Sequence, residues 1–309
     1  MISFIRRIEA DNIVFGIVCV LIATLGLSFK AILIKLVYQA DPNIDAISIL
    51  ALRFIMAMPF FLLLLRFALP KGNIHVSNGS GVYYIVILGA VGFYLSALLD
   101  FSSLAYISAG LERLILFLYP TFVVIISYFI RRQEITKNVV LALFVSYLGI
   151  AIVFMEHAPH FDANVLKGVL LVFAAAVVFA FYTVGSVQKI KQYGAIRFTA
   201  YAMSAATAVT LFHAYVSHGV TFFAQSVEIY VLIFVMAVVS TVVPLILMAE
   251  GVKRIGAATS SILSTAGPVI TLLLAYFILD EVFGALQSLG TVLIIVGIFF
   301  VTQRRKQTG

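Results

Sequence analysis

Runs of about 18 or more apolar residues recur along the whole chain, separated only by short polar stretches. As a helix, such a run crosses the ~30 Å hydrocarbon core of a bilayer, because a helix rises ~1.5 Å per residue. Membrane-spanning strands would instead alternate polar and apolar residues over about ten positions. The sequence therefore predicts an all-α integral membrane protein with ten transmembrane helices, at 13–36, 46–68, 82–103, 108–130, 138–155, 167–188, 195–217, 229–250, 258–279 and 284–302.

The composition and the missing motifs exclude several other classes. Charged residues make up only 11% of the 309 positions, too few to cover the surface of a soluble domain. The one cysteine, Cys19, lies inside the first span, so neither an intramolecular disulfide nor a cysteine metal site is expected. Walker-type loops, HExxH and Gly-x-Ser-x-Gly motifs are missing, and the five histidines are scattered. We therefore expect no enzyme activity, no cofactor and no metal.

Basic residues are concentrated in alternate loops. If the N-terminus is cytoplasmic, the outer loops carry only Lys167, with Lys35 at the outer edge of the first span. The inner segments then hold Arg6, Arg7, Arg66, Lys71, Arg131, Arg132, Lys137, Lys189, Lys191, Lys253, Arg254, Arg304, Arg305 and Lys306. This asymmetry obeys the positive-inside rule and predicts that both termini are cytoplasmic. It also explains the net charge of +7 without a nucleic-acid partner.

The sequence repeats itself at a shift of 148 residues. The matching positions are Ile107 and Ile255, Ala109 and Ala257, Pro120 and Pro268, the Tyr-Phe-Ile triplets at 128–130 and 276–278, and Gly149-Ile150 and Gly297-Ile298. Glu134 and Glu281 follow the triplets, one residue out of register. Because five spans are an odd number, the second copy must enter the membrane in the opposite orientation. We expect two inverted five-helix repeats, at 1–160 and 161–309.

Several segments resemble a known family. They are Arg53-Phe54, residues 104–130 (LAYISAGLERLILFLYPTFVVIISYFI), residues 251–281 (GVKRIGAATSSILSTAGPVITLLLAYFILDE) and the run at 289–301. In these segments the chain resembles the drug/metabolite transporter superfamily, in its EamA-type ten-helix branch. The resemblance implies a carrier in the bacterial cytoplasmic (inner) membrane, with a central cavity and alternating access. It favours export of a small metabolite, an amino acid or similar amphipathic solute, driven by protons or by the solute gradient.

Two other functions stay open at this point. One is a membrane-embedded enzyme that acts on a lipid or isoprenoid substrate, which would need acid, base or metal-binding residues gathered at one interface. The other is a channel or passive facilitator, which would not show counterflow.

Five charged residues lie inside the first four predicted spans: Lys30, Arg53, Asp100, Glu112 and Arg113. Each costs about 2.5–3.5 kcal/mol or more at the centre of a membrane, so each should face a cavity or a partner. Counting from the outer ends places all five in the outer half, Lys30 and Arg53 about 10 Å deep. Three cations and two anions give the group a charge of +1. Either the five pair among themselves and hold the bundle together, or some bind substrate or a coupling proton.

The repeat separates these possibilities. At a shift of 144 residues, Arg53 has a counterpart, Arg197, near the inner interface, which favours a structural role for Arg53. Glu112 has the uncharged Ser260 in its place in the second half. A charge present in one half only is a better candidate for binding substrate or a proton than one that the fold requires in both.

Two more pairs are candidates for conformational roles. Glu250 and Arg254 end the eighth span with i,i+4 spacing, which predicts an interfacial ion pair or an inner gate. Pro120 and Pro268 fall within spans, where a proline frees a backbone carbonyl and permits a kink. We interpret them as helix-packing positions or hinges.

Overall fold

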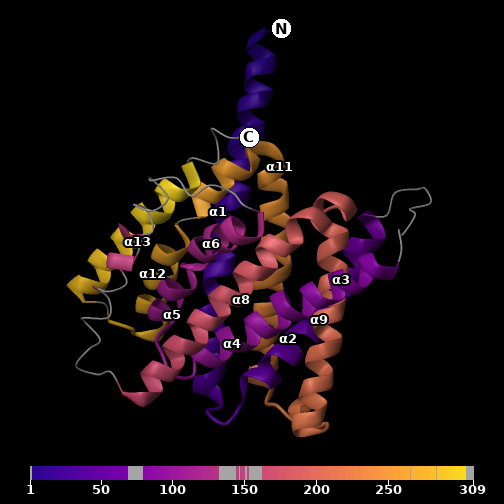
Figure 1. Cartoon of the computed structure of the whole chain (residues 1–309), viewed down its shortest axis with the longest axis vertical. Helices are drawn as coiled ribbons and strands as arrows, with labels where there is room; N and C mark the ends of the chain where they lie inside the picture. Colours follow the sequence, from indigo (N-terminus) through magenta and orange to yellow (C-terminus); the bar gives the residue numbers. More distant parts are fainter. Residues whose placement is uncertain are drawn as a thin grey trace.

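The computed structural model describes residues 2–68, 79–131, 144–145, 147–149, 152, 162–264, 266–282 and 284–303. Within these residues the secondary structure is helical and contains no strand (Figure 1). The elements in chain order are α1 (Ile2–Ala40), α2 (Ala46–Ala68), α3 (Gly79–Gly89), the π-helix η1 (Ala90–Leu95), α4 (Ser96–Ser103), α5 (Ala109–Leu116), α6 (Tyr119–Arg131), α8 (Ala163–Tyr193), α9 (Ala195–His218), the 3₁₀ turn η3 (Thr221–Phe223), α10 (Val227–Ala237), the π-helix η4 (Val238–Val242), α11 (Val243–Ser264), α12 (Gly267–Leu279) and α13 (Ala285–Gln303).

Six helical stretches in the described part of the chain are long and apolar enough to cross a membrane. They are Asn12–Ala40, Ala46–Leu63, Tyr83–Ser103, Ala109–Ile130, Ala163–Ile190 and Val227–Gly256. They correspond to the first, second, third, fourth, sixth and eighth predicted spans. The seventh and tenth form the helices α9 and α13. Most of the fifth, predicted at 138–155, lies outside the described residues.

The predicted continuous spans at 108–130 and 258–279 are each interrupted. The first is divided into α5 and α6, and the second into the end of α11 and α12. Pro120 and Pro268 each lie second in the helix that follows the interruption, not inside an unbroken helix. A proline in a first turn costs no hydrogen bond, because the first backbone N–H groups of a helix have no partner within it.

These interruptions recur at the same shift as the sequence repeat. The π-helix η4 begins 148 residues after η1, and α12 begins and ends 148 residues after α6. Ser108, which precedes α5 in an extended conformation, corresponds to Gly256, where α11 kinks with a φ of 79°. The two halves therefore have helical breaks at corresponding positions, in addition to the matching residues of the sequence repeat.

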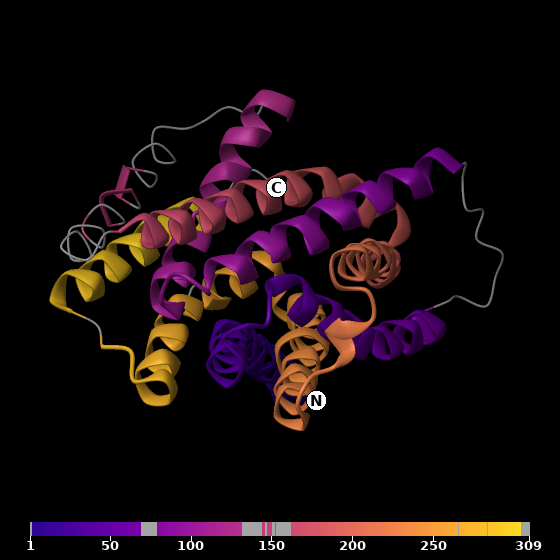
Figure 2. The same ribbon diagram turned by 90° about the horizontal axis from the view of Figure 1, so that it is seen from below.

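The halves also interlock. The first helix of the chain, α1, packs against α10, α11 and α12 of the second half, while α8 packs against α4, α5 and α6 of the first. The helices α2 and α9 complete the contact (Figure 2). Close approach is allowed by glycines: a Cβ at Gly26 would collide with the backbone oxygen of Val239. Each half thus completes the packing of the other.

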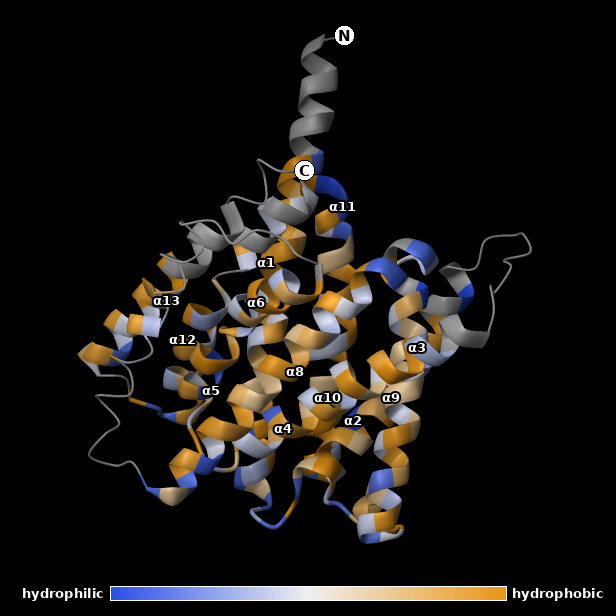
Figure 3. Cartoon of the chain, viewed as in Figure 1, coloured by the Kyte–Doolittle hydropathy of each residue, from blue (hydrophilic) through white to orange (hydrophobic). Residues whose placement is uncertain are grey.

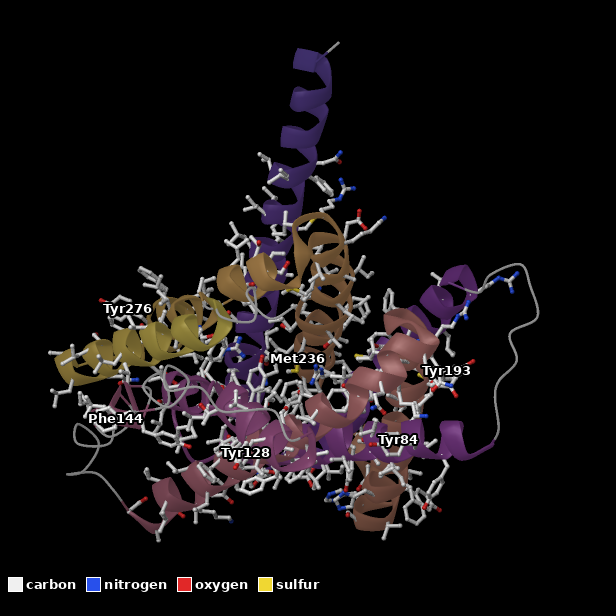
Figure 4. All side chains as sticks on the ribbon, turned by 45° about the horizontal axis from the view of Figure 1, so that its top comes forward. Tyr84, Tyr128, Phe144, Tyr193, Met236 and Tyr276 are labelled. Atoms are coloured by element: carbon white, nitrogen blue, oxygen red, sulfur yellow. The ribbon has the colours of Figure 1, made fainter. Side chains whose placement is uncertain are left out.

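Large apolar side chains are exposed on the outside of the described part of the chain as well as buried in its core. Figure 3 shows that apolar residues occur along most of the helices. Met236 lies fully buried at the centre of the bundle, whereas the repeat-related Tyr128 and Tyr276 are 44% and 52% exposed (Figure 4). Phe129 and Phe277 next to them are about three-quarters exposed. Apolar surface on this scale is expected of a protein that faces lipid.

Candidate functional site

The charged residues of the first four spans meet at one place in the fold. Lys30 of α1 forms an ion pair with Asp100 of α4, and its Nζ lies 4.0 Å from Oε1 of Glu112 on α5. Arg113 is close enough to act electrostatically on both carboxyl groups, and Arg53 of α2 on Asp100. The sequence predicted that these five charges gather at one depth, and the structure brings them together. Their role in substrate or proton binding stays a prediction.

Glu112 is the most deeply buried member of this charge cluster. Its side chain is 0% exposed, and neither carboxyl oxygen has a hydrogen-bond partner. The carboxyl group of Asp100 is its neighbour, although no hydrogen bond of ordinary geometry joins them. A buried carboxylate is costly unless it is paired. Glu112 is therefore a buried carboxyl group whose cationic neighbour, Lys30, lies at the outer limit of ion-pair distance.

Local structure around α5 positions Glu112. Ser108 begins the helix, and its hydroxyl accepts a hydrogen bond from the N–H of Leu111 at 3.1 Å. The carboxylate of Glu281, which follows α12, accepts hydrogen bonds from the N–H groups of Ala109 and Gly110 at 2.9 and 3.3 Å. Glu112 thus lies in the first turn of a helix that the other half of the chain caps. Sequence reasoning placed Glu281 in an outer loop and missed this contact.

Arg113 connects the cluster to the second half. Its guanidinium lies 5.4 Å from the centre of the Phe117 ring, and its buried Nε has no hydrogen-bond partner. A Cβ added to Gly267 would lie 3.1 Å from Nη2 of Arg113. At the same residue, the hydroxyl of Ser28 donates to the carbonyl oxygen of Gly267 at 3.1 Å. The cluster therefore borders the first turn of α12, at its interruption.

Arg53 makes a structural contact between the halves. Its Nε and Nη2 donate to Oγ1 of Thr241 at 3.0 and 2.8 Å, and its guanidinium lies 5.2 Å from the centre of the Phe101 ring. Thr241 belongs to η4, where the hydroxyl also donates to the carbonyl oxygen of Met236. A hydroxyl of the π-helix thus accepts both hydrogen bonds from Arg53. This contact agrees with the structural role that the repeat favours for Arg53.

Replacing Thr241 with valine should therefore destabilise the protein by about 1–3 kcal/mol, because Arg53 would keep buried donors without their acceptor. The matched control is Thr207→Val. The hydroxyl of Thr207 donates to the carbonyl oxygen of Met203 in its own helix, so this replacement should cost less than about 1 kcal/mol. Thermal unfolding in detergent measures both. Equal melting temperatures for the two variants would show that the Arg53 contact is not structural.

The candidate inner-gate pair lies at the other end of α1. Nη2 of Arg254 lies 2.7 Å from Oε1 of Glu250, and Nη1 donates to Asn12 at 2.5 Å. The guanidinium also lies 4.6 Å from the centre of the Phe15 ring. About a third of each charged side chain is exposed. The pair therefore joins α11 to α1 at the edge of the bundle.

Comparison with known proteins gives three related findings. The model of the EamA-like transporter family matches residues 14–155 and 166–303. An uncharacterised transporter of Bacillus subtilis, YcbK, is 33% identical over 298 residues, which cover 93% of this chain and 91% of that protein. An uncharacterised inner membrane transporter of Salmonella typhimurium, YicL, is 27% identical over 248 residues, covering 78% and 81%.

A solved crystal structure superimposes on 97% of this chain and 99% of its own, with a TM-score of 0.64 and 16% identity. At this identity the likeness concerns the fold alone.

Proposed function

The chain belongs to the EamA-like transporter family, and we propose that it exports a small metabolite, an amino acid or similar amphipathic solute, by alternating access. The observation that carries this proposal is the repeated set of helical breaks, each 148 residues after its counterpart. Two structurally alike halves of opposite orientation can adopt two mirror-related states, one open to each side of the membrane. An enzyme that acts on a membrane lipid needs no such symmetry.

The proposed architecture has ten spans in two inverted five-helix repeats, 1–160 and 161–309. Both termini lie in the cytoplasm and the protein lies in the bacterial inner membrane. The distribution of basic residues supports this orientation. The interlocking of α1 with α11 and α12, and of α8 with α4 and α6, supports the pairing of the repeats. A movement of one half against the other would change both ends of the bundle at once.

The proposed binding site is the charge cluster around Glu112. Its carboxyl groups, Glu112 and Asp100, suit the ammonium group of a zwitterion, while Arg113 and Lys30 suit its carboxylate. Arg113 also borders the first turn of α12, where backbone N–H groups favour an anion. A small amphipathic zwitterion would thus supply partners for buried atoms of Glu112, Asp100 and Arg113 that make no hydrogen bond within the protein.

Three further assignments complete the proposal. Glu112 is the candidate to carry a coupling proton, because its carboxyl group is buried and lacks hydrogen bonds. Pro120 and Pro268 mark the hinges, since the helices break in front of them. Glu250 and Arg254 form the inner gate, because their ion pair joins α11 to α1.

Uptake of radiolabelled amino acids and related metabolites into proteoliposomes tests this function. Saturable uptake of at least one solute, above that of protein-free liposomes, is expected. If no solute of a broad panel enters with a folded, monodisperse protein, the transporter proposal fails and an enzyme acting on a membrane lipid becomes the better explanation.

A further inference from the structure

We propose that the carboxylate of Glu281 is a latch that holds the outer side of the transporter closed. The inference rests on the proposed alternating access and orientation, and it gives a role to a residue outside the charge cluster. Glu281 follows α12 of the second half, and its carboxylate binds the start of α5 in the first half. The contact therefore joins the two halves directly at the outer end of the bundle.

The start of α5 needs this carboxylate. The first N–H groups of a helix have no partner within it. In α5 the regular helical hydrogen bonds begin with the N–H of Glu112, which bonds to the carbonyl oxygen of Ser108. Before it, the N–H of Leu111 bonds to the Ser108 hydroxyl, and those of Ala109 and Gly110 bond to Glu281. All three N–H groups from Ala109 to Leu111 are thus satisfied, two of them by the opposite half of the chain.

The latch can open only when something replaces the carboxylate. Ala109 is 0% exposed and Gly110 is buried, so their N–H groups would be left without partners in an apolar environment if Glu281 withdrew. Such unpaired groups are strongly unfavourable inside a membrane. Water that enters an open outer vestibule would satisfy them. The latch would thus alternate between a closed state with Glu281 bound, as in the structure, and an open state with the amides hydrated.

A backbone turn positions Glu281, and a cation lies near it. Asp280 ends α12 in the left-handed conformation, with a φ of 55°, and is the one non-glycine residue with positive φ in the described chain. This turn redirects the chain so that Glu281 reaches α5. Lys35 of α1 is close enough to act electrostatically on Glu281. Three elements, α1, α5 and the end of α12, therefore meet at one carboxylate.

Cysteine accessibility from outside the cell tests the latch without any substrate. In a Cys19→Ser background, Ala31→Cys places a reporter on α1 one turn below Lys35, at a position that is 1% exposed. A membrane-impermeant maleimide added to intact cells should label it slowly. Asn43→Cys, at an exposed outer turn, should label rapidly. An unlabelled Asn43→Cys would overturn the outer placement of the latch.

Removing the carboxylate should open the outer side more often. We expect Glu281→Ala to raise the labelling rate of the reporter about fivefold or more, and Glu281→Gln to raise it less, because an amide oxygen can still accept one hydrogen bond. The matched control, Asp280→Asn, removes the neighbouring charge and should change the rate less than about twofold. Each variant is first checked for a monodisperse, folded protein.

Equal labelling rates in Glu281→Ala, Glu281→Gln and the control would overturn the latch. This result is independent of transport, because labelling needs no solute. If wild-type protein moves no solute, the proposed function fails, and the labelling rates still decide whether Glu281 closes the outer side.

Discussion

Replacing Lys30 with methionine should lower the free energy of unfolding by about 3–5 kcal/mol, because a buried charge that loses its partner is strongly destabilising. Lys30 is the ion-pair partner of Asp100 and of Glu112, whose side chains are 5% and 0% exposed. Methionine preserves most of the volume of the lysine side chain while removing its charge. The loss should appear as a lower melting temperature in detergent.

The control for this effect is Lys167→Met. Lys167 is exposed and contacts Tyr106, with a hydrogen bond of 2.7 Å, so its loss should cost less than about 1 kcal/mol. A second variant separates charge from packing: Asp100→Leu added to Lys30→Met removes one unpaired carboxyl group and should recover part of the lost stability. If Lys30→Met melts at the same temperature as Lys167→Met, the cluster does not depend on its ion pairs.

Replacing Glu112 with glutamine should reduce transport by about tenfold or more while leaving the protein folded. The side chain has no hydrogen bond to lose, and glutamine has nearly the same shape. What changes is the capacity to pair with a cationic group or to take up and release a proton. The measurement is saturable uptake into proteoliposomes, at equal amounts of monodisperse protein.

Glu228→Gln is the matched control for Glu112→Gln. Glu228 lies exposed in the first turn of α10, so the same chemical change there should leave uptake unaltered. Uptake by Glu112→Gln at the wild-type rate would remove Glu112 from the transport cycle and leave it a purely structural role in the cluster.

The sequence predicted the helical class, most of the helix positions and the meeting of the charged residues. Long apolar runs define spans because the bilayer imposes their length. The depth of each charged residue in its span predicts which others it can contact, because a charge inside a membrane needs a partner at its own depth. The second predicted span, 46–68, agrees with α2 at both ends. The shift of 148 residues also appears in the helical breaks, although the proposed repeat boundaries stay a prediction.

The interruptions and the latch could not be predicted in the same way. The apolar run Ala109–Ile130 continues across the break before Tyr119, so its composition alone does not show where α5 ends and α6 begins. Pro120 predicts an irregularity in the helix, but it does not say which kind, because a proline is compatible both with a kink and with the first turn of a new helix. Glu281 lies 172 residues from Ala109 in the sequence, so only the packing of the two halves brings them together.

Counterflow in proteoliposomes tests the central claim, alternating access, most directly. Proteoliposomes are loaded with a high concentration of an unlabelled transported solute and diluted into a trace of the labelled solute. A carrier that exposes one site alternately to each side should accumulate label inside transiently, above its equilibrium level, before it declines. Label that rises steadily to equilibrium, or equal label in liposomes without protein, would contradict alternating access.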